Sequence, residues 1–171
     1  RRSSDLIGLG VDGILLITDP IDTALLCQLL TLNLKTENTS SIRPAVFSSR
    51  WAMTTDFLVT GGKTAEGVVF SHYYDPDSNK PRYKKFKREY TKTYGEPPPF
   101  AAAGGYEAVT VLAQALRVND SQEQLKNTLL SIEQFEGLQS PIRFDDYGDV
   151  KRTHHIIKVQ NGRFKAIEYQ K

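Results

Sequence analysis

The chain has 171 residues, of which 39% are hydrophobic and 25% are charged. This is the balance of a globular protein, and no apolar run approaches the roughly 20 residues that a membrane-spanning helix needs. A single cysteine, Cys27, excludes an internal disulfide framework and a cysteine-cluster metal site. The net charge of +2 argues against a dedicated polyanion binder. The start at Arg1-Arg2-Ser3 is neither Met nor a signal peptide, so we expect the chain to begin in mid-protein.

The first part of the chain alternates between predicted strands and helices. Three short apolar runs are typical of strands buried on both faces of a parallel sheet: residues 12–18, 44–49 and 67–74. Leucines at helical spacing predict a helix after the first run, with Asp22 or Thr23 as its cap. Residues 56–60 predict a short helix that Gly61-Gly62 ends. This order predicts right-handed βαβ units and an α/β fold.

The middle of the chain is predicted to be helical. Residues 75–80 form its richest turn segment and are the best candidate for a hinge or lobe boundary. After it, Tyr83, Phe86, Tyr90 and Tyr94 recur on one helix face, which is the spacing of a packed core stripe. The Ala-rich run 101–118 is apolar over much of its surface and predicts a well-buried helix.

The same region concentrates positive charge. Residues 80–92 hold seven basic residues and one acidic residue, a net charge of +6, which leaves −4 for the rest of the chain. Such a helix is either a nucleic-acid footprint or a solvated face. No known nucleic-acid-binding motif accompanies it, so we favour the solvated face and expect no nucleic-acid partner.

The C-terminal part returns to strands. Residues 153–160 and 163–169 are predicted strands joined at Asn161-Gly162, a tight hairpin signal. The segment 145–149 contains three aspartates, which offer oxygen ligands for calcium. The ligand spacing and terminal Glu of a calcium loop are missing, so we interpret the segment as a β-turn.

Motifs for catalysis and cofactors are incomplete. Gly62-Lys63-Thr64 resembles the end of a phosphate-binding loop, but Phe57 stands where that loop needs a glycine. His154 and His155 point to opposite faces of a strand and do not readily share a metal ion. No motif in the sequence combines a nucleophile, a base and an orienting group, as a catalytic site requires. We therefore expect a protein that is not an enzyme and has no metal or other cofactor.

What remains is a set of polar and aromatic residues at strand ends. In open α/β sheets, ligands bind beyond the carboxyl ends of the strands. Asp19 follows the first predicted strand, Ser49-Arg50-Trp51 the second and Tyr73 lies at the end of the third. Hydroxyls, a guanidinium and aromatic rings suit a small polar or aromatic ligand. Arg50 is either an anion clamp or an exposed loop residue.

The order of several motifs resembles the C-terminal half of the type 1 periplasmic binding proteins, in the branched-chain amino acid (Leu/Ile/Val) substrate-binding group of ABC transporters. No single motif is specific, but their order and spacing cover almost the whole chain. The stretches are Gly10 to Leu16, Phe47 to Ala52, Gly61 to Val68, Phe86 to Pro97, Tyr106 to Val109 with Ala115-Leu116, and Phe135 to Asp149.

The resemblance implies a two-lobed α/β fold of parallel sheets with flanking helices that closes on a ligand. It assigns residues 1–74 to part of the C-terminal lobe, 75–80 to a crossover, 81–141 to a helical return to the N-terminal lobe, and 142–171 to a crossover and the terminal hairpin of the C-terminal lobe. It places Asp19, Ser49, Arg50, Trp51 and the segment 100–103, with Phe100 and Ala102, at the ligand. Tyr73 joins this set from the strand-end argument alone.

One departure concerns Arg50, because amino-acid carriers of this group often have an acidic residue there that pairs with the ligand's ammonium. The leading hypothesis is a periplasmic or extracellular solute-binding protein, with or without a lipid anchor, that captures an amino acid or carboxylate for an ABC permease. The alternatives are a ligand-sensing input domain of a signalling receptor or regulator and an α/β enzyme. Because the N-terminal lobe segment is missing, we expect this chain alone to bind ligand poorly.

Overall fold

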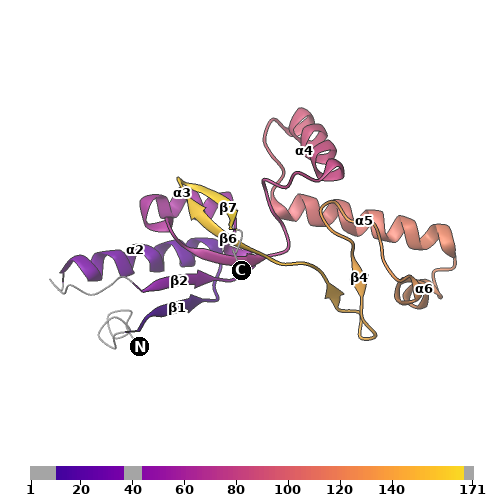
Figure 1. Cartoon of the computed structure of the whole chain (residues 1–171), viewed down its shortest axis with the longest axis horizontal. Coiled ribbons are helices and arrows are strands. Elements are labelled where there is room, and N and C mark those ends of the chain that lie inside the picture. The colour runs from indigo at the N-terminus through magenta and orange to yellow at the C-terminus, as the bar shows by residue number, and fades with distance from the viewer. Residues whose placement is uncertain (1–10, 37–43, 168–171) are drawn as a thin grey trace. The chain divides into compact units, whose positions relative to one another are not determined.

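A computed structural model describes residues 11–36 and 44–167, and the chain divides into two compact units. Unit 1 runs to His72 and resumes at His155, whereas unit 2 comprises Tyr73–His154. The chain therefore passes between the units twice (Figure 1).

Unit 1 is built on a five-stranded mixed sheet in the order β1-β2-β3-β6-β7. Its strands are β1 (Gly13–Leu16), β2 (Ala45–Ser48), β3 (Val69–His72), β6 (His155–Gln160) and β7 (Arg163–Ile167). The first three are parallel, and β6 runs antiparallel to both β3 and β7. Asn161 and Gly162 join β6 to β7 with φ values of 55° and 68°, as a tight hairpin turn requires. The predicted α/β fold and terminal hairpin are confirmed.

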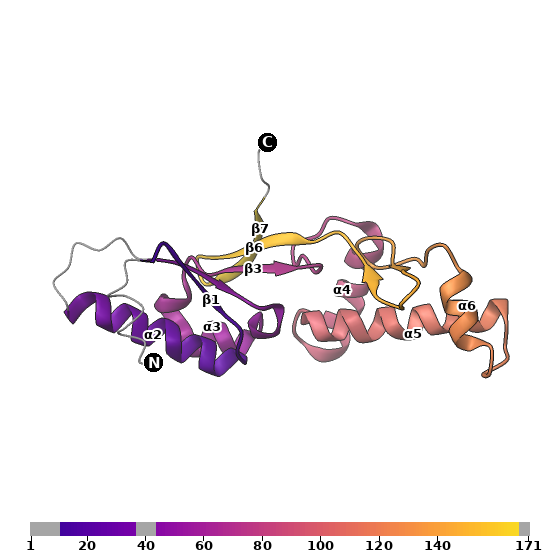
Figure 2. The ribbon, with the colours of Figure 1, turned by 90° about the horizontal axis from the view of Figure 1, so that it is seen from below.

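Helices cover one face of this sheet. They are α2 (Pro20–Thr36), α3 (Thr55–Gly61) and the 3-10 turns η1 (Arg50–Ala52) and η2 (Gly62–Ala65). Figure 2 shows α2 and α3 on the same side of the strands. Phe57 of α3 packs edge-on against Phe70 of β3, with ring centroids 5.4 Å apart. On the other face, Leu15 is 64% exposed and Phe47 43%. The expected burial of the strands on both faces is therefore wrong for the described part of the chain.

Gly61 is the last residue of α3 and Gly62 caps its C-terminus, so the predicted end of this helix is confirmed. Gly62 adopts a φ of 50° and opens η2, so the Gly62-Lys63-Thr64 motif follows a helix rather than joining a strand to a helix. A phosphate-binding loop joins a strand to a helix, so this motif does not have the surroundings of such a loop.

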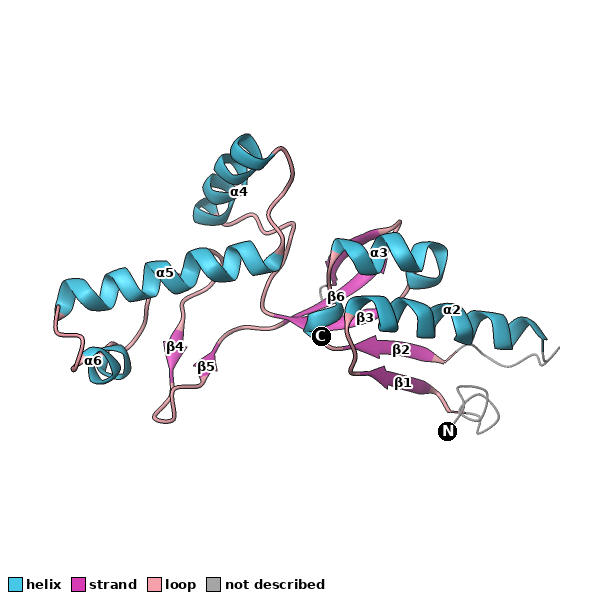
Figure 3. Cartoon of the chain, turned by 180° about the vertical axis from the view of Figure 1, so that it is seen from behind, coloured by secondary structure: helices cyan, strands magenta, loops and turns pink. Residues whose placement is uncertain are grey.

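Unit 2 is helical with one small hairpin (Figure 3). Its elements are α4 (Pro81–Tyr94), α5 (Phe100–Val118), α6 (Leu125–Ser131), β4 (Arg143–Phe144) and β5 (Val150–Lys151). Val111 and Ala115 of α5 pack with Phe135 and Ile142 in its core. The aspartate segment between β4 and β5 is a β-turn, as interpreted from the sequence: the Asp145 carboxylate accepts the backbone N–H groups of residues 147 and 149 at 3.0 and 2.9 Å.

The two long helices of unit 2 are less buried than their sequences predict. One face of α5 is buried through Ala103, Glu107, Val111 and Ala115. Its opposite face is exposed through Tyr106, Val109, Leu112 and Leu116. In the aromatic stripe of α4 only Tyr83 is buried, and Tyr94 is 65% exposed. Helical periodicity predicted which faces are apolar, but the described residues cover only part of them.

Candidate functional site

The predicted site residues of unit 1 lie at one edge of its sheet. Because β1 and β2 are parallel and in register, with Leu16 opposite Ser48, their carboxyl ends meet at the same edge. The Leu16 carbonyl accepts hydrogen bonds from the Ser49 N–H at 3.1 Å and from the Ser48 hydroxyl at 3.2 Å. These bonds tie the start of the Ser49-Arg50-Trp51 loop to the strand that leads into Asp19.

Asp19 is exposed and caps the N-terminus of α2. Its Oδ1 accepts the backbone N–H groups of Ile21 at 2.8 Å and Asp22 at 3.0 Å. The N–H group of Asp22 is the main cause that lowers the pKa of the Asp19 carboxyl. The predicted caps, Asp22 and Thr23, are wrong, because the helix already begins at Pro20, a residue favoured at the first helical position.

Ser49, Arg50 and Trp51 form the turn after β2. The Ser49 Oγ is buried and has no hydrogen-bond partner among the described residues. Arg50 and Trp51 begin η1 and are both exposed, with the guanidinium carbon 5.6 Å from the centre of the indole ring. This turn thus combines a buried hydroxyl with a cation and a large exposed aromatic surface.

The other predicted residues belong to unit 2. Phe100 and Ala102 are half-buried in the first turn of α5. Tyr73 stacks under Arg152, whose guanidinium carbon lies 4.5 Å from the ring centre. A Cβ added to Gly104 would lie 3.4 Å from the Tyr73 hydroxyl, so this ring lies against the start of α5. The structure therefore groups Tyr73 with the N-terminal part of α5, and groups Asp19 with Ser49, Arg50 and Trp51.

Unit 2 contains a buried ion pair that no sequence pattern predicted. Arg152 makes two hydrogen bonds to Glu107, at 2.6 and 2.9 Å, and the two side chains are only 8% and 6% exposed. Oε1 of Glu107 also accepts the N–H of Leu138 at 2.6 Å. The partners are 45 residues apart, so no local spacing in the sequence connects them.

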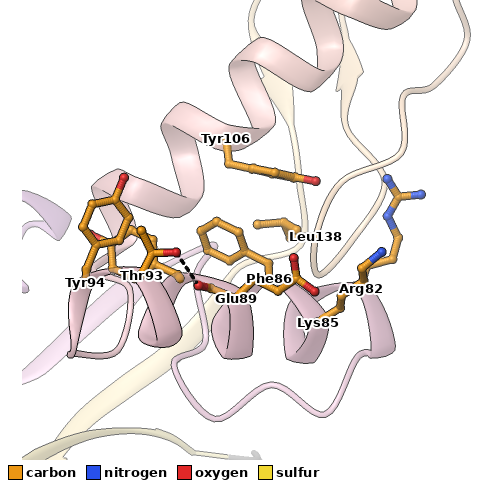
Figure 4. Close-up of a pocket in the computed structure, with 9 residues that line it drawn as sticks. Arg82, Lys85, Phe86, Glu89, Thr93, Tyr94, Tyr106 and Leu138 are labelled. Atoms are coloured by element: carbon orange, nitrogen blue, oxygen red, sulfur yellow. Dashed lines mark hydrogen bonds between the residues drawn. The ribbon is translucent and has the colours of Figure 1, made fainter.

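A groove of about 570 Å³ lies between α4 and α5. Figure 4 shows Phe86, Tyr106 and Leu138 close together there, with Phe86 and Tyr106 ring centroids 4.9 Å apart. Its lining residues are Arg82, Lys85, Phe86, Glu89, Tyr90, Thr93, Tyr94, Tyr106 and Leu138. The groove contains none of the predicted site residues, and through Tyr106 it continues the exposed apolar face of α5.

Within residues 11–36 and 44–167, no three His, Cys, Asp or Glu side chains are grouped so that they could hold a metal ion. No helix in these ranges has the length and apolar character needed to cross a membrane.

The fold is similar to that of solved bacterial binding proteins. A leucine-binding protein from Thermotoga maritima superposes with a TM-score of 0.82 at 22% identity, over 97% of this chain and 46% of that one. An ABC transporter substrate-binding protein from Desulfitobacterium hafniense gives 0.77 at 26% identity, over 98% and 49%. A solute-binding protein from R. palustris, solved with benzoate, gives 0.78 at 12% identity, over 96% and 44%.

The chain thus spans about half the length of the structures that it matches. Residues 6–163 also match the sequence profile of a family described as periplasmic binding protein. The resemblance that the sequence motifs indicated is confirmed by these two results. The chain belongs to the periplasmic binding protein family.

Proposed function

We propose that this chain forms part of an extracytoplasmic solute-binding protein that captures a small amino acid or another carboxylate for an ABC permease. Membership of the periplasmic binding protein family supports the binding role. Two structural relatives support the ligand class: one is named for leucine and one holds benzoate, and both compounds carry a carboxylate.

The observation that carries this proposal is the buried Ser49 hydroxyl, which has no partner among the described residues and stands next to the Arg50 cation. A buried hydroxyl without a hydrogen bond is costly, so a ligand oxygen that pairs with it gains affinity. The Arg50 guanidinium can bind a carboxylate through two parallel hydrogen bonds. Trp51 offers an exposed ring for the apolar part of the ligand.

Asp19 extends the proposal to amino acids. One of its carboxylate oxygens caps α2, and its lowered pKa keeps it ionised at neutral pH. A zwitterionic ligand presents both charges, so its ammonium would pair with Asp19 while its carboxylate pairs with Arg50. Asp19→Asn keeps the helix cap but removes the charge. We expect this change to weaken binding of leucine and to leave binding of benzoate unchanged.

The lobe assignment is part of the same proposal. Residues 1–74 and the terminal hairpin would belong to the C-terminal lobe, residues 81–141 would return to the N-terminal lobe, and residues 75–80 and 142–149 would be crossovers. Tyr73, Phe100 and Ala102 would then contribute ligand contacts in addition to those of Asp19 and the Ser49-Arg50-Trp51 turn. Ligand capture would proceed by closure of the two lobes.

The experiment is a thermal-shift screen of the full-length protein that would contain both lobes, with leucine, benzoate and dicarboxylates, followed by calorimetry on variants. Arg50→Ala should weaken binding of the best carboxylate by about 1–3 kcal/mol, the scale of a lost charged hydrogen bond. Lys63→Ala, which removes an exposed cation elsewhere in unit 1, is the matched control. Equal affinities of Arg50→Ala and the unmodified protein would contradict the role of Arg50.

A further inference from the structure

The outward surface of α4 carries a strip of positive charge. Lys84, Arg88 and Lys92 follow one another at intervals of four residues, and Lys85 lies beside them, so the four side chains span about 100° of the helix circumference. We call these four residues the basic arc. All four are exposed. The opposite side of α4 carries Tyr83 and its aromatic neighbours, so Lys84, Arg88 and Lys92 face away from the packed side of the helix, while Lys85 also borders the groove between α4 and α5.

The charge of the basic arc is not balanced locally. Within the described residues, Lys84, Lys85 and Lys92 make no ion pair, and Arg88 approaches only Glu89, at 3.7 Å in a solvent-exposed pair. Unit 2 has twelve basic and twelve acidic residues and is neutral, whereas α4 alone carries +5. Like charges four residues apart destabilise a helix, so the arrangement opposes the stability of α4.

We propose that the basic arc binds the anionic headgroup surface of a phospholipid membrane. Three of the four residues are lysines, whose hydrated point charges suit a diffuse array of anions better than a fixed bidentate site. The arc lies on the exposed surface of a helix and has no aromatic side chain on which nucleic-acid bases could stack. A fluid layer of lipid headgroups can adjust to such a surface, whereas an acidic groove on a folded protein partner cannot.

The expected strength follows from the number of charges. Each Lys or Arg near an anionic membrane contributes about a fivefold gain in partitioning. Loss of three lysines should therefore lower the partition coefficient about a hundredfold. The attraction acts over a Debye length, which is about 10 Å at moderate salt and about 3 Å at 1 M, so concentrated salt should release the protein. This inference does not depend on the proposed ligand.

The test is co-sedimentation of the full chain with phosphatidylcholine vesicles that do or do not contain phosphatidylglycerol. We expect binding only to the anionic vesicles and release in concentrated salt. The combined substitutions Lys84→Gln, Lys85→Gln and Lys92→Gln should cause the hundredfold loss, and circular dichroism should show that the helix persists, since Gln has nearly the helix propensity of Lys.

The matched control removes three exposed lysines elsewhere, by Lys63→Gln, Lys126→Gln and Lys151→Gln. It changes net charge equally and should keep most of the binding. The proposal is overturned if the unmodified chain ignores anionic vesicles, if both triple variants lose binding equally, or if the chain prefers duplex DNA or an acidic polypeptide to the vesicles at the same salt.

Discussion

The buried ion pair of unit 2 makes a sharp prediction about stability. Arg152→Met leaves the Glu107 carboxylate without its cation in a site where that side chain is only 6% exposed. Removal of one partner from a buried pair costs about 3–5 kcal/mol, because the remaining charge is neither paired nor hydrated. Methionine keeps an apolar contact with the Tyr73 ring, so the loss reports mainly on the ion pair.

Two comparisons isolate the electrostatic effect. Glu107→Gln combined with Arg152→Met leaves no buried charge, while the new amide can still accept the Leu138 N–H, so the double variant should be more stable than Arg152→Met alone. Arg82→Met breaks the pair between Arg82 and Glu136, whose side chains are 47% and 71% exposed. That change should cost about 0–1 kcal/mol, as for other solvent-exposed pairs.

Urea unfolding followed by far-ultraviolet circular dichroism gives the free energies, and hydrogen exchange of the α5 amides localises the effect. Fluorescence of Trp51, the single tryptophan, reports on unit 1 and is an internal reference. Equal costs for Arg152→Met and Arg82→Met would refute the reasoning, as would a double variant less stable than Arg152→Met.

Three other predictions test details of the structure. Tyr74→Phe should cost about 1–3 kcal/mol in urea unfolding, because its buried hydroxyl donates to a backbone carbonyl at 2.7 Å. Burial raises the pKa of Tyr74, so the stabilisation by its protonated hydroxyl should be complete below about pH 10 and decline above it. An absorbance titration can follow the ionisation of the tyrosines over this range. Gly162→Ala should destabilise the hairpin, since the φ of Gly162 is 68°. Gly105→Ala should instead stabilise the protein by about 0.5–1 kcal/mol in thermal melts, because Gly105 lies within α5 and a Cβ there would contact no other residue. Because the pKa of Asp19 is lowered, its carboxylate stabilises the fold at neutral pH, and this stabilisation is lost as the pH falls below about 4. In Asp19→Asn the melting temperature should therefore fall less steeply with decreasing pH in that range.

Most of the fold could be predicted from local patterns. The apolar runs became β1, β2 and β3, and Asn161-Gly162 became the hairpin turn, because each pattern has a direct backbone cause. The predicted cap at Asp22 or Thr23 puts the start of α2 too late, because Asp19-Pro20 is itself a helix-start signal.

Burial was predicted less well than secondary structure. The sequence of α5 is apolar around most of its circumference, which is typical of a helix that is covered on all sides. Val109 nevertheless remains 68% exposed and Leu116 37%. A periodic pattern indicates which side chains favour burial, but it contains no information on which segment covers them.

The candidate site also has features that the sequence predicts and features that it does not. The shared edge of Asp19 and Ser49 follows from parallel strand order, so a sequence argument can reach it. The missing hydrogen-bond partner of the Ser49 hydroxyl depends on how the whole turn packs, and no spacing in the sequence reveals it. The role of these residues in ligand binding stays a prediction until binding to the variants is measured.

The pair of Glu107 and Arg152 shows why a charged group can occupy an interior position. Apolar side chains of similar volume would fill the space but would leave the Leu138 N–H without its acceptor. The Glu107 carboxylate instead joins α5, the turn at Leu138 and the segment at Arg152, and Gly137 is required there because a Cβ would collide with the Ser140 carbonyl. Arg152 in turn holds the ring of Tyr73. Since buried pairs add little net stability over apolar replacements, we expect this pair to contribute mainly by fixing the positions of three segments that are distant in sequence.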